Sequence, residues 1–171
     1  MNYRRPGEGE YNSYYQGYID QTGSNDFLSE LKNALPNTIT FLENLPAEKW
    51  DFKYAPEKWT IKEVMLHIID TERVFAYRAM RVARNDKTPM PGFEQDDYVP
   101  NSNASQRSAS SVIEEYAALR NSTIQLFQNF SEDQLNRIGT ASGFPISTLA
   151  LGFILAGHEA HHMRIIREKY L

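Results

Sequence analysis

The sequence predicts an all-α fold, a four-helix bundle with one long crossover between helices 2 and 3, from three observations. Four segments carry apolar residues at spacings of three and four, the period of a helix with one buried face. A proline-containing connection from 85 to 107 separates the second segment from the third. At about 3.3 Å per extended residue, this connection can cross the whole length of a bundle. No segment shows the alternation that is typical of a half-buried strand.

Residues 1–171 fit one domain, since about 100–200 residues is the usual domain size. Residues 1–25 hold five of the ten tyrosines among glycines and charged residues, without a long period. We expect them to form an N-terminal arm over the domain, with one or two helical turns. The first long helix follows Asp26, and Pro36 should kink or split it. Its apolar positions are Phe27, Leu28, Leu31, Leu35, Ile39, Leu42 and Leu45.

The second helix has the clearest start, because Thr60 and Glu63 fit a capping box. It should end near Arg84. A third helix fits 111–130, and Ser131 with Gln134 is a second capping signal that predicts a short helix before a turn at 139–143. The last helix should begin at Ser147 or Thr148 and continue almost to the end of the chain.

Composition excludes several kinds of site. The chain has 18 Lys and Arg against 22 Asp and Glu, a net charge of −4, and no basic tract, so we expect no nucleic-acid partner. It has no cysteine, so any metal must be held by His, Asp or Glu. The first thirty residues lack the apolar region of a signal peptide, and no run approaches a membrane span of about 20 residues. We therefore expect a cytoplasmic protein without a membrane partner.

The four histidines occupy two places, His67 in the second helix and His158, His161 and His162 in the last. His158 and His162, at i,i+4, share one helix face and continue an apolar stripe, so they could hold one metal ion. The pair His158 and His161, at i,i+3, fits nearly as well, and spacing alone does not choose between them. His67 could supply a third ligand, leaving a position for water or substrate. The simpler alternative is that these are core histidines with ordinary hydrogen bonds.

Residues 158–162, HEAHH, formally match the H-E-x-x-H helix of zinc peptidases. That interpretation is weak, because only nine residues follow His162 and none is a histidine. Glu159 is then a solvated residue, a hydrogen-bond partner of a ligand or a bystander.

Three charged residues after His67 are candidates for catalysis: Asp70, Glu72 and Arg73. Asp70 shares a face with His67 and could accept a ring N–H or act as a base. Arg73 and Arg78 could bind an anionic substrate. For each of these residues, the competing interpretation is a surface ion pair.

These motifs together resemble the DinB/YfiT-like superfamily. The resemblance is carried by residues 58–64 (KWTIKEV), then His67, Asp70, Glu72, Arg73, Tyr77 and Arg78, and the HEAHH segment. The loop 88–93 and the tyrosine-rich arm are similar to one subgroup. The resemblance implies a four-helix bundle with a long crossover, and a divalent metal whose ligands map onto His67, His158 and His162. It also implies a homodimer.

The resemblance implies a metal-dependent hydrolase, in which the metal activates water to attack a small-molecule substrate. The alternative in this superfamily is a thiol-dependent S-transferase or isomerase, with bacillithiol, mycothiol or glutathione as co-substrate. A third possibility is a non-catalytic metal-binding stress protein. A triple-histidine site suits Zn, Ni, Fe or Mn, so the sequence does not name the metal. If the crossover returns to the histidines, residues 94–98 should form a wall or lid of the site.

Overall fold

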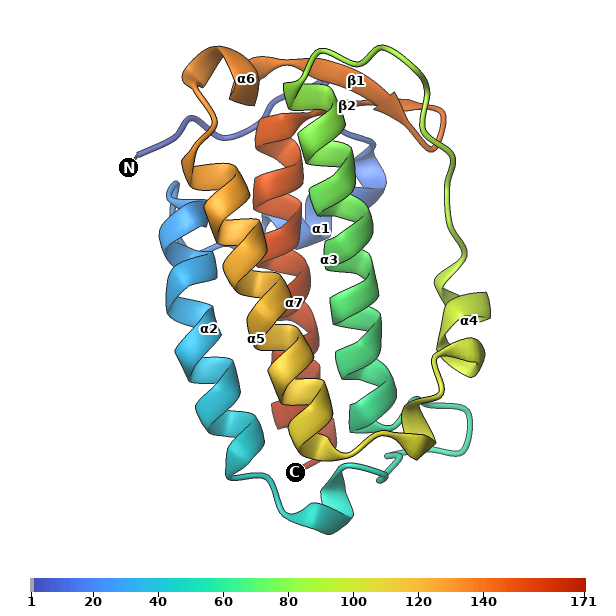
Figure 1. The fold of residues 1–171 in the computed structure, drawn as a ribbon. Coiled ribbons are helices and arrows are strands. Elements are labelled where there is room, and N and C mark those ends of the chain that lie inside the picture. The colour runs from blue at the N-terminus through green and yellow to red at the C-terminus, as the bar shows by residue number, and fades with distance from the viewer. Residues whose placement is uncertain (1) are drawn as a thin grey trace.

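Four long helices form the bundle in the computed structural model, which describes residues 2–171. They are α2 (Phe27–Glu43), α3 (Ile61–Ala83), α5 (Ala109–Gln128) and α7 (Thr148–Lys169). α3 packs against both α5 and α7, and α2 packs against the same two helices (Figure 1). The predicted four-helix bundle is therefore confirmed. Within the described residues, no helix is both long enough and apolar enough to cross a membrane.

The chain path contains the predicted crossover. In Figure 1, α2 runs down and α3 runs up, and the following connection returns along the outside of the bundle before α5 runs up beside α3. The short helix α4 (Gln95–Tyr98) and the 3₁₀ turns η3 (Val99–Asn101) and η4 (Ala104–Gln106) lie on this connection. A further turn, η2 (Ala47–Lys49), joins α2 to α3. As a result α3 and α5 are parallel.

Each long helix begins after a polar residue whose side chain accepts a hydrogen bond from a backbone N–H three residues on, which satisfies one of the free donors at the helix start. The four residues are Asp26, Thr60, Ser108 and Ser147. At Thr60 the full capping box with Glu63 is present, as the sequence predicted. Pro36 lies inside α2 without splitting it.

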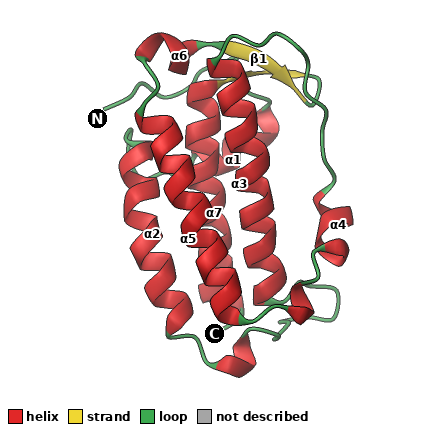
Figure 2. Ribbon diagram, in the orientation of Figure 1, coloured by secondary structure: helices red, strands yellow, loops and turns green. Residues whose placement is uncertain are grey.

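A β-hairpin closes one end of the bundle, and the expectation of no strand is wrong there (Figure 2). It follows the short helix α6 (Glu132–Asn136) and pairs β1 (Ile138–Ala141) with β2 (Phe144–Ser147). Ser142 and Gly143 form its two-residue turn with φ of 52° and 81°, the positive values that such hairpin turns require. Met90 of the crossover donates to the Thr140 carbonyl at 2.9 Å. Strands of four residues are too short to show alternation in sequence.

The N-terminal arm contains η1 (Ser13–Tyr15) and α1 (Gln16–Ile19), and α1 packs against α7. The contact depends on Gly157, because a Cβ at that position would lie 1.8 Å from the backbone oxygen of Tyr18. Only a glycine permits this approach. It brings the tyrosines of the arm to the turn of α7 that carries His158.

A layer of polar side chains divides the core into two apolar clusters. On α7, the apolar side chains from Leu149 to Ala156 belong to one cluster, and Met163 and Ile166 belong to the other. Between these clusters α3, α5 and α7 bury polar side chains: Thr71, Glu72, Arg120, Thr123, His158 and Glu159. Burying so many polar groups at mid-height is costly unless they are bonded. The candidate site lies in this layer.

Candidate metal centre

His67, His158 and His162 converge on one point between α3 and α7. The Nε2 atom of His158 lies 3.0 Å from that of His67 and 3.1 Å from that of His162. One ring nitrogen from each residue falls within 4.8 Å of the other two. His67 and His158 are each only 4% exposed, whereas His162 is partly exposed. The three residues that the resemblance implied as ligands are thus brought together.

The electrostatic environment keeps these imidazoles neutral. Burial lowers the pKa of His67 to about 4, although the nearby Asp96 opposes the shift, and burial lowers the pKa of His162 to about 3. Burial and the neighbouring histidines also hold the pKa of His158 well below its usual range. Neutral imidazole is the form that binds a metal.

The donor geometry fits a shared cation better than it fits hydrogen bonding. A neutral imidazole Nε2 either donates one proton or accepts one. The Nε2 atom of His158 lies within bonding distance of two other ring nitrogens, so one of the two contacts has no hydrogen bond to hold it. A divalent transition metal would be a common partner for all three atoms, since imidazole is one of its preferred ligands. Metal binding itself stays a prediction.

His161 does not join the cluster. Its side chain is partly exposed, and its ring packs against Tyr18 with 5.4 Å between centroids. Successive residues of an α-helix are rotated by about 100°, so His161 faces the arm while His162 faces α3. Of these two residues, His162 is the one whose ring nitrogen lies beside that of His158 and near that of His67.

A cavity of about 320 Å³ lies against His158. Its walls come from the arm, from α3 and from the crossover, and the lining residues are Tyr14, Tyr15, Tyr18, Thr71, Phe75, Phe93, Glu94, Gln95 and Asp96. Glu94, Gln95 and Asp96 were predicted to form a wall or lid of the site, and they do line this cavity. Asp97 and Tyr98 do not line it, and Tyr98 is exposed and packs against Phe93. The tyrosines of the arm were missed as site residues, and their clustering in residues 1–25 was the available signal.

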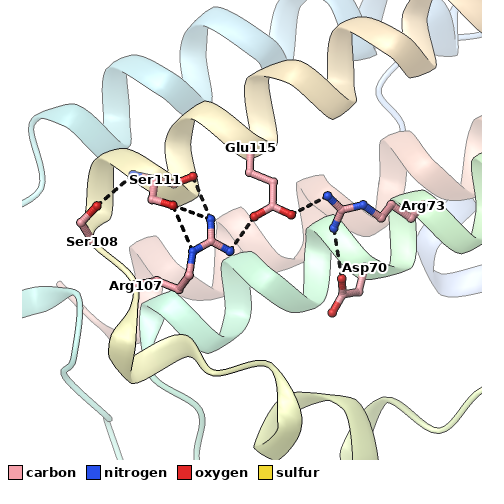
Figure 3. Close-up of polar contacts among 6 residues, drawn as sticks. All are labelled: Asp70, Arg73, Arg107, Ser108, Ser111 and Glu115. Atoms are coloured by element: carbon pink, nitrogen blue, oxygen red, sulfur yellow. Dashed lines mark hydrogen bonds and ion pairs between the residues drawn. The ribbon is translucent and has the colours of Figure 1, made fainter.

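Asp70 and Arg73 lie in a chain of ion pairs (Figure 3), and neither residue lines this cavity. Arg73 donates to Asp70 at 3.3 Å and to Glu115 of α5, and Arg107 contacts the other oxygen of Glu115 at 2.6 Å. Burial raises the pKa of Asp70, while the Arg73 guanidinium opposes this shift. For both residues, the structure therefore agrees with the interpretation as a surface ion pair.

Glu72 is different, because it is 2% exposed and belongs to the core. Its carboxylate accepts from Arg120 at 2.6 Å, and Arg120 also donates to Glu159 at 2.5 Å. The surface interpretation of Glu72 and the solvated interpretation of Glu159 are therefore wrong. The Glu159 carboxylate is held by Arg120, Tyr116 and Thr38, which leaves it no role as a peptidase base.

Arg120 was missed by sequence reasoning. Arg120 is fully buried, whereas its neighbour Leu119 is only half-buried. Arg120 follows Tyr116 by four residues and precedes Ile124 by four, so its place in the apolar stripe was a usable signal. A charged residue in such a stripe indicates a buried partner.

The fold and the site together define a four-helix bundle with a long crossover and a candidate three-histidine metal centre. Residues 30–166 match the DinB superfamily, and the chain belongs to that family. It is 25% identical over 140 residues to a protein of Oceanobacillus iheyensis named a putative metal-dependent hydrolase, which covers 79% of this chain and 76% of the relative.

The fold is similar to that of YfiT from Bacillus subtilis, with a TM-score of 0.62 over 96% of this chain and 93% of that one. YfiT is described as a probable metal-dependent hydrolase with an unusual four-helix bundle topology. The two sequences are 15% identical, so this similarity supports the fold alone.

Proposed function

We propose that the protein is a metal-dependent hydrolase of a small molecule, with His67, His158 and His162 as the metal ligands. The observation that carries the proposal is the convergence of three neutral imidazoles, two buried and one partly buried, beside a cavity. A divalent metal bound in this way lowers the pKa of its bound water to about 7 and so provides a nucleophile at neutral pH. The name of the Oceanobacillus iheyensis relative, a putative metal-dependent hydrolase, supports the proposal.

The chain's own residues shape the reaction site around the histidines. Tyr18 and Trp59 pack against His158 and His67, with ring centroids 5.1 Å and 5.0 Å apart, and so hold the imidazoles in place. Glu94 and Asp96 are the carboxylates that line the cavity. We propose these two, in place of Asp70 and Glu72, as the groups able to accept a proton from the attacking nucleophile.

Metal stoichiometry of single alanine variants tests the ligand assignment. We expect His67→Ala, His158→Ala and His162→Ala to lose metal to a similar degree, because two remaining imidazoles compete poorly with water for the ion. His161→Ala is the matched control and should retain it. Elemental analysis after purification without a nickel column measures the outcome. Loss in His161→Ala with retention in His162→Ala would overturn the assignment.

Turnover with and without thiol tests the reaction. Metal-loaded protein is incubated with a panel of small esters, amides and alkyl halides, in the absence and presence of bacillithiol, mycothiol or glutathione. The hydrolase proposal expects product without thiol. Turnover that requires the thiol would establish the S-transferase alternative, and metal binding without turnover in either arm would favour the non-catalytic stress protein.

A further inference from the structure

Arg78 is a buried cation without a buried anion. It is 3% exposed, and across residues 2–171 no carboxylate lies within ion-pair distance of its guanidinium. Its Nη2 atom donates to the Pro91 carbonyl at 2.7 Å and to the Ser142 hydroxyl at 3.1 Å, and Tyr15 offers a phenol oxygen. All these partners are neutral. The other buried arginine, Arg120, has two carboxylates, so this unpaired charge calls for a ligand.

Arg78 lines a cavity of about 300 Å³, and it is the one charged residue of that lining. The cavity shares Tyr14, Tyr15 and Phe75 with the cavity at His158, so the two adjoin. Arg78 follows His67 by eleven residues on α3, which places the two within about 20° of each other around the helix and about 16 Å apart along it. One elongated molecule can therefore lie along this face of α3.

The residues between the two ends are aromatic, with one free polar group. Phe75 lies 5.4 Å from the Arg78 guanidinium and meets the Tyr15 ring edge-on. The hydroxyl of Thr71 is buried and has no hydrogen-bond partner in the part of the chain that the structure describes. Thr71 lines the cavity at His158, where a substrate could satisfy it.

The charges of the two cavities are opposite. Glu94 and Asp96 line the cavity at His158, whereas Arg78 alone carries charge in the adjoining one. An anionic group is therefore attracted to the Arg78 end and repelled from the carboxylates at the histidine end. This asymmetry would set the direction in which a substrate binds.

We propose that Arg78 binds the anionic end, a carboxylate or a phosphate, of an elongated substrate whose apolar middle packs on Tyr15 and Phe75. The neutral, reactive end then lies at His158. The assignment of the reactive end rests on the proposed function, whereas anion binding at Arg78 does not. Bidentate recognition of either anion by a guanidinium is the chemistry that carries the proposal.

Calorimetric binding of three probes to metal-free and metal-loaded protein tests this inference. The probes are 3-phenylpropionate, 2-phenylethyl phosphate and the neutral 3-phenylpropanamide. We expect wild type to bind at least one anion roughly tenfold more tightly than the amide, as a charge-assisted contact implies. The stronger of the two anions identifies the group. Arg78→Met should remove the preference, and the exposed control Arg84→Met should keep it.

A second variant keeps the test decisive if Arg78→Met does not fold. Ser142→Asp places a carboxylate beside Nη2, at a positive φ that Asp tolerates. It should abolish the anion preference and raise the melting temperature, because the buried cation is then paired within the chain. The proposal is overturned if wild type binds none of the probes, if it binds them equally, or if both variants keep the preference. If the protein binds no metal at the histidines but still prefers the anionic probes to the amide, the proposed function is contradicted and the inference about Arg78 stands.

Discussion

Two clusters of polar side chains include residues from the same turn of α3, and they differ in burial. The inner cluster consists of Glu72, Arg120 and Glu159, with Tyr116 and Thr38; the outer cluster consists of Asp70, Arg73, Arg107 and Glu115 (Figure 3). Side chains of the inner ion pairs are 0–3% exposed, whereas those of the outer pairs are 24–47% exposed. An ion pair in the inner cluster should therefore contribute differently to the free energy of unfolding from an ion pair in the outer cluster.

The inner cluster joins the helices that carry the histidines. Arg120 of α5 donates through Nε and Nη2 to Glu72 on α3 and through Nη1 to Glu159 on α7. Thr38 of α2 adds a bond of 2.9 Å to Glu159. All four long helices thus meet in this layer, next to His158. The outer cluster joins only α3, α5 and the end of the crossover, where water competes for every contact.

Replacing Arg120 should have the largest effect. Arg120→Met leaves two carboxylates buried without a cation, and breaking a buried pair in this way costs about 3–5 kcal/mol of unfolding free energy. Urea denaturation of metal-free protein measures the loss. The matched control, Arg73→Met in the outer cluster, should lose less than about 1 kcal/mol. Equal losses in the two variants would contradict the claim that burial separates the clusters.

Replacing Glu159 should have the next largest effect. Glu159→Gln keeps an oxygen for Tyr116 and Thr38 but turns an amide or a neutral oxygen toward Arg120, so it weakens a charged hydrogen bond worth about 1.5–3 kcal/mol. Arg120 keeps Glu72, which is why the loss should be smaller than for Arg120→Met. The control is Glu168→Gln, an exposed glutamate of the same helix. A loss no greater than that of the control would show that Glu72 alone neutralises Arg120.

The two clusters also show how far the sequence could predict this structure. Periodicity and the capping box at Thr60 were sufficient for the long helices, because amphipathic faces and caps are local features. Which helices are neighbours is a tertiary feature, so spacing alone could not choose between His161 and His162. Glu72 and Arg73 are adjacent in sequence, yet α3 turns one inward and the other outward. Only the position of Arg120 in the buried stripe of α5 indicated that a carboxylate lies opposite.

The same limit explains the site residues that sequence reasoning missed. The tyrosines of the arm reach the cavity because Gly157 lets α1 approach α7, a contact between segments about 140 residues apart. Arg78 was considered as an anion ligand, but its lack of a carboxylate partner is visible only when every neighbouring element is placed. The hairpin at 138–147 is stabilised in part by Met90, which comes from the distant crossover.

The smallest effect should come from Glu115 and should depend on pH. Burial by itself would raise the pKa of Glu115, but hydrogen bonds from Arg73 and Arg107 hold it below its ordinary value of 4.5. A lowered carboxylate pKa stabilises the fold above the unfolded pKa, and this stability is lost as pH falls through the folded pKa. Because the arginines are partly exposed, solvent screening limits the effect to at most about 1 kcal/mol.

Glu115→Gln should therefore be slightly less stable than wild type at pH 7, and this difference should shrink at acidic pH, as the Glu115 carboxylate becomes protonated in the folded chain. Urea denaturation at neutral and at acidic pH measures the difference, with Glu114→Gln, its exposed neighbour, as the control. High salt should shrink the stability difference at pH 7, because the Debye screening length falls to about 3 Å at 1 M salt and exposed charges then interact weakly. If the loss of unfolding free energy in Glu115→Gln persists in high salt and at low pH, Glu115 behaves like the residues of the inner cluster. Exposure would then be a poor guide to how much an ion pair contributes to stability.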